Sequence, residues 1–217
     1  MKLIILGNSL FSRKLKYDIE HFTDDEVVAF SLDSPYISSD RFDGLPLVPF
    51  EELQRLFPPN DYQLLNTLGY KRMLATRRDF HWRAKALGYT LYTYKHPSNK
   101  LCSPVGEGSI VLDGVSIDFN CMLGIGGIYW SNARIGEACR VGDFTYWAPG
   151  SVGCGNLDIG DRCFIGANAT LRDGISLAPM TLVGAGVYMN RSVKEPNKMF
   201  KSPYPVEGAK PAEEWCQ

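Results

Sequence analysis

A repeat of six residues runs in one phase from Ser109 to Ser192, and it constrains the fold more than any other feature of this chain. The repeated position is mostly a large apolar residue, and it is occupied by Val111, Ile117, Leu123, Tyr129, Ile135, Val141, Trp147, Gly153, Ile159, Ile165, Leu171, Leu177, Val183 and Met189. A mostly small residue stands two places earlier, and glycine often follows. Such hexads predict a parallel β-helix, in which three hexads make one triangular coil.

The first hundred residues lack the repeat and instead alternate apolar runs with helical patterns. The apolar runs predict strands at 2–6, 26–32, 45–48, 62–67 and 90–94. Helices are expected after Ser9, over 50–56 and over 71–87. We therefore expect an α/β plus β fold: a small Rossmann-like parallel α/β domain, followed by a left-handed parallel β-helix. The expected boundaries are 1–100 for the first domain, 101–192 for the β-helix and 193–217 for a polar tail.

The composition excludes several classes of function. The 217 residues carry a net charge of −1, which gives no indication of a nucleic-acid partner. No apolar run reaches membrane-spanning length, and the first residues do not resemble a signal peptide, so we expect no membrane partner and a cytoplasmic location. Three of the six cysteines, Cys121, Cys139 and Cys163, fall on the small position of the repeat, where reduced buried thiols are expected.

Three predicted strands of the first domain end in residues suited to binding a ligand. Ligands of open parallel sheets bind beside the carboxyl ends of the strands. Those ends supply the candidate substrate-binding residues Gly7, Asn8, Ser9, Asp33, Ser34, Gly69, Tyr70 and Lys71. A full GxGxxG motif is absent, which favours a smaller phosphorylated or nucleotide-bearing ligand over a dinucleotide. The alternative is that Gly7 merely turns the chain.

The whole chain resembles the PglD-like and NeuD-like sugar acyltransferases of bacterial glycan assembly, which acylate an amino sugar carried on a nucleotide diphosphate. The resemblance is carried by five segments: 2–8 (KLIILGN), 96–98 (HPS), 139–144 (CRVGDF), 148–150 (APG) and 155–160 (GNLDIG). It implies a homotrimer with active sites between neighbouring β-helices. It also implies an acyl-CoA co-substrate, acetyl-CoA above all, along the coils and the sugar nucleotide in the α/β domain.

This chain differs from the family at the positions that the family uses for catalysis. The family's catalytic His falls on Glu137, and a second His, which contacts the cofactor, falls on Tyr146. The histidines of this chain are His21, His81 and His96, all before the β-helix. A β-helical carbonic anhydrase needs three His ligands for its metal, so we expect no metal site.

Transfer to an amine remains chemically feasible without that base. A sugar amine beside electron-withdrawing hydroxyls is less basic than lysine, so a useful fraction is neutral near pH 7. Losing a general base typically costs about 10²–10⁴-fold, and positioning alone supplies a large acceleration. Because an alcohol is a poorer nucleophile, the departure favours N-acylation over O-acylation.

Glu137 is the candidate replacement base. A step of 18 residues moves one coil along the same face, so Glu137 should lie beside Phe119 and Gly155. The resemblance places the pantetheine arm along Gly155. The alternative is that Glu137 is a solvated turn residue.

Aromatic residues mark a second candidate region. Tyr129 and Trp147 stand one coil apart on the repeat and should stack in the interior. Core packing is the simpler interpretation; the alternative is a reshaped wall of the site, helped by Trp130 and Tyr146. We take Trp130 as a candidate substrate-binding residue and Tyr146 as a candidate catalytic residue.

The cofactor candidates lie on later coils and leave backbone amides open for pantetheine. They are Gly155, Gly166, Ala167, Gly184 and Ala185. The resemblance adds Pro203, which matches the proline of a Gly-x-Pro-Ala element that the family places near the adenine. These glycines are equally well explained as tight corners.

Together these observations predict an acyl-CoA-dependent N-acyltransferase that acts on a nucleotide-linked amino sugar of bacterial surface glycan biosynthesis. The alternatives are an O-acyltransferase of the same fold and a non-catalytic sugar-nucleotide-binding module.

Overall fold

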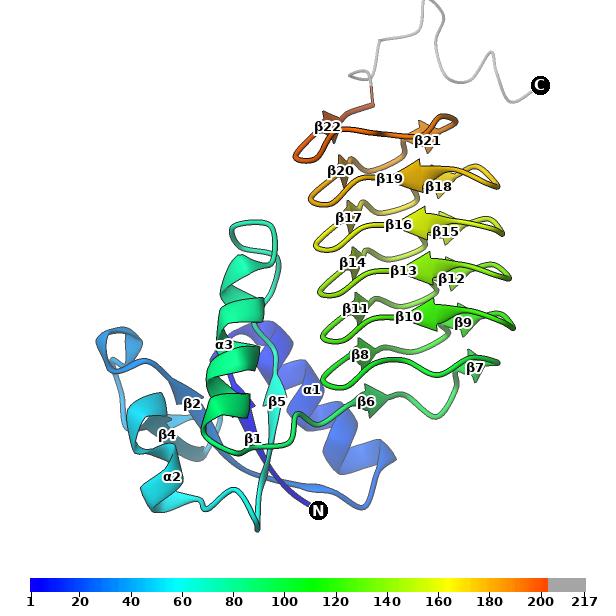
Figure 1. Cartoon of the computed structure of the whole chain (residues 1–217). Coiled ribbons are helices and arrows are strands. Elements are labelled where there is room, and N and C mark those ends of the chain that lie inside the picture. The colour runs from blue at the N-terminus through cyan, green and yellow to red at the C-terminus, as the bar shows by residue number, and fades with distance from the viewer. Residues whose placement is uncertain (203–217) are drawn as a thin grey trace, which may run out of the picture.

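The computed structural model describes residues 1–202, which form an α/β domain beside a tall triangular β-helix (Figure 1). The α/β domain contains one five-stranded sheet in the order β3-β4-β2-β1-β5. Its strands are β1 (Lys2–Leu6), β2 (Glu26–Leu32), β3 (Arg41–Phe42), β4 (Leu45–Pro49) and β5 (Gln63–Asn66). The β1–β2, β1–β5 and β2–β4 pairs are parallel, and the edge strand β3 is antiparallel to β4. The sheet is therefore mixed rather than purely parallel as predicted.

Helices cover both faces of this sheet. They are α1 (Leu10–Phe22), the 3₁₀ turns η1 (Ser34–Tyr36) and η2 (Phe50–Glu52), α2 (Leu53–Leu56) and α3 (Ala75–Ala86). Leu15 and Ile19 of α1 pack on one face with Leu3 and Ile5. The opposite face packs against η2, α2 and α3. Most predicted elements are confirmed to within a few residues.

Two predictions in this domain were wrong. The predicted helix over 71–87 begins only at Ala75, because residues 72–74 form a left-handed turn. The predicted last strand over 90–94 is split between the domains. Leu91 makes a single bridge to Leu64, whereas Tyr94 and Lys95 form β6 (Tyr94–Lys95), which pairs with the β-helix strand β8.

Three parallel sheets with a constant register of 18 residues build most of the β-helix, as the hexads predict. The sheet facing the α/β domain contains β6, β8 (Ile110–Val111), β11 (Ile128–Tyr129), β14 (Tyr146–Trp147), β17 (Phe164–Ile165), β20 (Leu182–Val183) and β22 (Met199–Phe200). The second contains β7 (Lys100–Leu101), β9 (Ser116–Ile117), β12 (Arg134–Ile135), β15 (Val152–Gly153), β18 (Thr170–Leu171) and β21 (Tyr188–Met189). The third contains β10 (Met122–Leu123), β13 (Arg140–Val141), β16 (Asp158–Ile159) and β19 (Ser176–Leu177). This architecture is typical of a left-handed β-helix and confirms the predicted fold class.

Each corner of the β-helix turns through one residue in the left-handed conformation. The residue three places before each repeated position has a φ between 53° and 72°. Most of these residues are Gly or Asn, which adopt this conformation most readily. The exceptions are Ala138, Phe144, Arg162 and Met180.

The interior holds the rings of Tyr129 and Trp147, and a glycine beside each ring leaves room for it. Both side chains are fully buried. A Cβ on Gly127 would lie 2.7 Å from Tyr129 Cε2, and a Cβ on Gly153 would lie 2.9 Å from Trp147 Cη2. The expectation of core packing is confirmed for these two residues, and the alternative that they form a wall of the site is wrong.

The buried cysteines are free thiols. Cys121, Cys139 and Cys163 donate to backbone carbonyls across the interior. Burial raises the pKa of both Cys139 and Cys163 to about 11, so these thiols stay protonated at neutral pH.

A buried arginine joins the two domains. Arg77 on α3 is fully buried, and its Nε donates to the Gly126 carbonyl at 2.7 Å. Its Nη2 donates to the Gly108 carbonyl at 2.9 Å, and its Nη1 donates to the carbonyls of Asn66 and Leu68. Burial lowers the pKa of Arg77 to about 9, which leaves it charged at neutral pH. One guanidinium thus spans β5, the loop after it and two corners of the β-helix.

Candidate functional site

A pocket of 370 Å³ lies where the carboxyl ends of β1 and β5 meet the β-helix. The strand order reverses between these two strands, which is where open α/β sheets bind ligands. The pocket is lined by Ser9, Phe11, Thr67, Gly69, Tyr70, Lys71, Trp130 and Tyr146. The structure therefore brings together six of the predicted site residues, from both domains.

Aromatic rings form the walls of this pocket. Phe11 stacks on Trp130 with ring centroids 4.8 Å apart. Tyr146 stacks on Phe164 at 4.7 Å, and the Tyr70 ring meets both of them edge-on at 5.3 Å. The Trp130 Nε1 is buried and lacks a hydrogen-bond partner among residues 1–202. Flat apolar walls with a spare donor suit a base or a sugar ring.

The charge of the pocket favours an anionic ligand. Among residues 1–202, Lys71 is the one charged residue that lines it. Ser9 caps the 13-residue helix α1 through a capping box with Ser12, and the first turn of α1 carries no acidic residue. A lysine beside the N-terminus of a helix is a favourable setting for phosphate.

Tyr146 stays protonated in this setting. Burial raises the pKa of Tyr146 to about 12, with a smaller contribution from Tyr70. At neutral pH its phenol can donate a hydrogen bond but is a poor proton acceptor. This favours orientation of a ligand over general-base catalysis.

Four predicted substrate-binding residues do not line the pocket. Asp33 is bound by Arg83 through two hydrogen bonds of 2.7 and 3.0 Å. The Ser34 hydroxyl donates to Glu51 at 3.0 Å, and Asn8 is exposed outside the pocket.

Gly7, the fourth of these residues, permits a close contact below the pocket. Its φ is 126°, and a Cβ there would lie 2.6 Å from Thr67 Oγ1. Gly7 therefore turns the chain at this point, and its part in substrate binding stays a prediction.

Sequence reasoning missed Phe11 and Thr67. Both lie within two residues of predicted pocket residues, at the start of α1 and after β5. Thr67 donates to the Leu6 carbonyl at 2.7 Å and so ties the two strand ends together. Phe11 occupies an ordinary apolar position of a helix, so nothing in the sequence indicates that its ring contacts Trp130.

Glu137 lies at a different place, in an open groove of 490 Å³ along the corner between the second and third sheets. A Cβ on Gly155 would lie 2.6 Å from Glu137 Oε1 and 3.1 Å from Asp173 Oδ1. The predicted neighbours Glu137 and Gly155 are thus in contact. Since Tyr146 points out of the sheet that faces the α/β domain, the structure separates the two candidate catalytic residues within one chain.

The other candidate cofactor residues follow another corner, between the first and second sheets. A Cβ on Gly166 would lie 2.5 Å from the backbone nitrogen of Ala185, and a Cβ on Gly184 would lie 2.9 Å from the Phe200 carbonyl. Close stacking of coils explains both glycines, and contact of this corner, including Ala167, with a cofactor stays a prediction. Pro203 lies outside the described residues.

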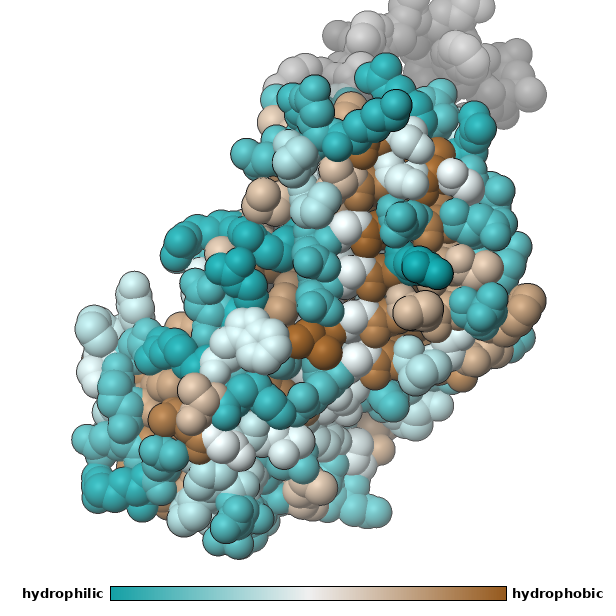
Figure 2. Space-filling view, viewed as in Figure 1, coloured by the Kyte–Doolittle hydropathy of each residue, from teal (hydrophilic) through white to brown (hydrophobic). Residues whose placement is uncertain are grey.

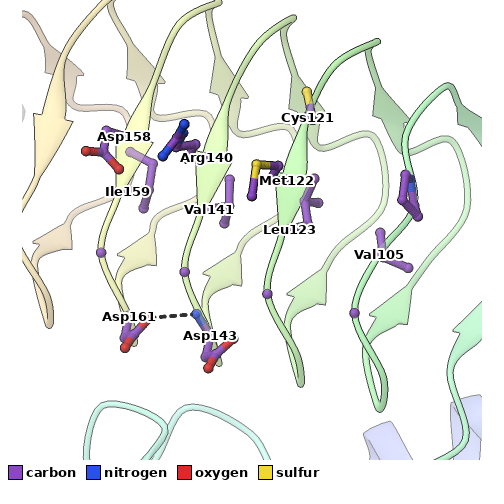
Figure 3. Close-up of a pocket in the computed structure, with 15 residues that line it drawn as sticks. Val105, Cys121, Met122, Leu123, Arg140, Val141, Asp143, Asp158, Ile159 and Asp161 are labelled. Carbon is purple, nitrogen blue, oxygen red and sulfur yellow. Dashed lines mark hydrogen bonds between the residues drawn. The ribbon is translucent and has the colours of Figure 1, made fainter.

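A narrow column of apolar residues runs along the third sheet beside exposed polar ones. Figure 2 shows apolar residues gathered in a column over this sheet. A groove of 650 Å³ crosses it, and Met122, Arg140 and Asp158 lie on successive coils there (Figure 3).

Carboxylates order the corner below this sheet. Asp143 Oδ1 accepts from the amide of Ile125 at 2.9 Å, and Asp161 Oδ1 accepts from the amide of Asp143 at 2.8 Å. A Cβ on Gly142 would lie 2.4 Å from Asp161 Oδ1. The Gly142-Asp143 pair of the sequence is therefore explained by the stacking of the corners.

Within residues 1–202, no group of three or more His, Cys, Asp or Glu side chains is arranged to hold a metal ion. Among the same residues, no helix has the length and apolar character needed to cross a membrane.

Comparison with known proteins agrees with this architecture. Residues 157–191 match the family described as hexapeptide repeat of succinyl-transferase. The chain is 31% identical over 98 residues to GDP-perosamine N-acetyltransferase of Escherichia coli O157:H7, a match that spans 43% of each chain. The aligned segment thus covers less than half of that curated relative.

Solved structures match over nearly the whole chain. A point mutant of perosamine N-acetyltransferase from Caulobacter crescentus, in complex with CoA and GDP-perosamine, has a TM-score of 0.79 at 25% identity and covers 89% of this chain and 90% of its own. The acetyltransferase domain of PglB from Neisseria gonorrhoeae, in complex with acetyl coenzyme A, has a TM-score of 0.76 at 24% identity and covers 88% and 92%. These findings confirm the predicted resemblance.

Proposed function

We propose that this chain, a relative of the hexapeptide-repeat sugar N-acetyltransferases, transfers an acetyl group from acetyl-CoA to the amine of a nucleotide-linked sugar. The observation that carries the proposal is the pocket between the two domains. It combines aromatic walls, one lysine and a helix N-terminus at the switch point of the sheet. A nucleoside diphosphate sugar has the matching parts: rings that stack and phosphates that need a positive field.

The acyl donor is proposed to lie along the β-helix corner that carries Glu137 and Gly155. This open groove of 490 Å³ suits an extended pantetheine arm. The acceptor amine attacks the thioester carbon, the carbon–sulfur bond breaks, and the CoA thiolate leaves. The proton of the ammonium goes to Glu137, which takes the place of the histidine that the resemblance implies there.

The geometry of one chain favours a site shared between copies. The acceptor pocket opens on the first sheet, whereas Glu137 lies at the corner formed by the other two sheets. A second copy is needed to bring a Glu137 to the pocket, in keeping with the expected homotrimer. Phe119 and Met122, each more than three-fifths exposed, give this side of the β-helix an apolar surface for such a contact.

A mixing experiment tests the shared site. Glu137→Gln removes the proposed proton acceptor and should lower kcat by about 10²–10⁴-fold. Trp130→Leu removes an aromatic wall of the acceptor pocket.

If one copy supplies the pocket and its neighbour supplies Glu137, refolding the two variants together restores intact sites. A random 1:1 mixture makes about a quarter of all sites intact, so at acceptor concentrations well below KM activity should rise towards about a quarter of wild type. Activity that stays at the average of the two separate variants would contradict the shared site.

A further inference from the structure

Residues 72–74 form a left-handed turn that needs a restraint to hold it. Arg72, Met73 and Leu74 have φ values of 52°, 49° and 62°. None is Gly, Asn or Asp, and consecutive residues of other types are strongly disfavoured in this conformation. Strained segments of this kind persist only where the surrounding structure fixes them, and they gather at functional sites.

Two contacts with the β-helix fix the turn. The Leu74 side chain is fully buried in a cluster with Ile128, Phe144 and Tyr146. Arg162, at a corner of the β-helix, donates from Nε to the Met73 carbonyl at 2.8 Å and from Nη2 to the Arg72 carbonyl at 3.1 Å.

Arg162 has no other side-chain role in the described part of the chain. Within residues 1–202 its guanidinium makes no ion pair with a carboxylate, and its side-chain hydrogen bonds all go to this turn. The corner itself needs no arginine, because Asn occupies equivalent left-handed corners at Asn132, Asn156 and Asn168. The side chain is therefore explained by the turn and not by the coil.

The turn directly determines the wall of the acceptor pocket. Tyr70 and Lys71, which precede it, both line the pocket. The Leu74 amide donates to the Tyr70 carbonyl at 3.2 Å, so the shape of the turn sets the backbone of Tyr70. The Tyr70 ring, although 59% exposed, meets the rings of Tyr146 and Phe164 edge-on.

We propose that Arg162 is a positioning residue for acceptor binding: it clamps the left-handed turn and thereby holds Tyr70 and Lys71 on the pocket wall. This inference rests on the proposed function of the pocket as the acceptor site. Arg162 acts through the turn and does not touch the reacting atoms.

Arg162→Asn tests the clamp, because Asn keeps the left-handed corner and removes both hydrogen bonds. The KM for the nucleotide-linked amino sugar should rise about tenfold, whereas kcat and the KM for acetyl-CoA should stay within about twofold of wild type. Amide hydrogen exchange of residues 70–78 should become faster by a similar factor, while exchange in the other coils should not change.

Two further variants serve as controls. Met180→Asn places the same residue at the equivalent corner one coil later, and it should leave the acceptor KM and the exchange rates unchanged. Arg162→Lys keeps the charge but not the two-pronged donor geometry, so its acceptor KM should lie between those of wild type and Arg162→Asn.

Unchanged exchange of residues 70–78 in Arg162→Asn would overturn the clamp. Full recovery of the acceptor KM by Arg162→Lys would also overturn it, since charge alone would then suffice. If the wild-type protein transfers no acetyl group, the proposed function fails. Hydrogen exchange still decides in that case whether Arg162 holds the turn, and titration with nucleoside diphosphates decides whether the turn affects binding.

Discussion

Replacing Arg77 with Met should destabilise the protein more than any exposed substitution, because this guanidinium joins the two domains. It donates to four backbone carbonyls, those of Asn66, Leu68, Gly108 and Gly126. Arg77 is the recorded donor for the Gly108 and Gly126 carbonyls within residues 1–202. Methionine fills part of the volume but donates to none of them.

The magnitude follows from what the substitution leaves behind. A hydrogen bond from a charged donor contributes about 1.5–3 kcal/mol, but burying the guanidinium also costs several kcal/mol, which the substitution recovers. What remains is three buried carbonyls, those of Asn66, Gly108 and Gly126, at about 1 kcal/mol each, and the half-buried Leu68 carbonyl, which adds less. We therefore expect Arg77→Met to lower the free energy of unfolding by about 3–4 kcal/mol, a large part of the stability of an ordinary domain.

Urea unfolding followed by circular dichroism and by tryptophan fluorescence measures this loss. Arg77→Lys keeps the charge and some donors, so it should lose about half as much. Arg55→Met is the control: its ion pair with Glu52 is exposed, and its effect should stay within about 0.5 kcal/mol. A loss below about 1 kcal/mol for Arg77→Met would refute the reasoning that this residue satisfies buried carbonyls.

Three further predictions concern the core and the pocket. Burial lowers the pKa of His81 from 6.5 to about 4, so the folded state binds fewer protons than the unfolded chain between these pH values. The free energy of unfolding should therefore fall by about 2–3 kcal/mol from pH 7 to pH 4. Urea unfolding of His81→Phe should show a smaller loss over the same range, and an equal loss would contradict the role of His81. Gly153→Val should lower the free energy of unfolding by about 1–3 kcal/mol because the valine side chain meets Trp147. In a double-mutant cycle, adding Trp147→Leu should give a favourable coupling energy. Additive losses would contradict this packing. Trp130→Leu should weaken binding of a nucleotide-linked amino sugar about tenfold by calorimetry, while Trp82→Leu, on the exposed side of α3, should not; equal effects would argue against the pocket.

The β-helix could be predicted almost completely from the sequence because its repeat is short and each coil contacts the next at one fixed spacing. Each repeated residue meets the residue 18 positions later, so one regular pattern specifies the strands that the structure contains. The same arithmetic placed Glu137 against Gly155.

The acceptor pocket was only partly predictable because its walls come from distant segments. Strand ends pointed to Ser9 and to the stretch after β5, but Asp33 pairs with Arg83 of α3 instead of facing the pocket. Phe11 meets Trp130 only after the two domains pack. The left-handed turn over 72–74 gave no signal, because a helical pattern covers residues that tertiary contacts force out of the helix.

A mass-spectrometric assay of turnover tests the proposed acetyl transfer directly. Purified protein is incubated with acetyl-CoA and a panel of amino sugars linked to UDP, dTDP or GDP, with the free amino sugars and the hydroxyl analogues as controls. We expect one added acetyl group on a nucleotide-linked amino sugar, and little or none on either control. Acetylation of a hydroxyl analogue would show an O-acyltransferase. No product and no binding of acetyl-CoA would contradict the proposed enzyme and favour a sugar-nucleotide-binding module.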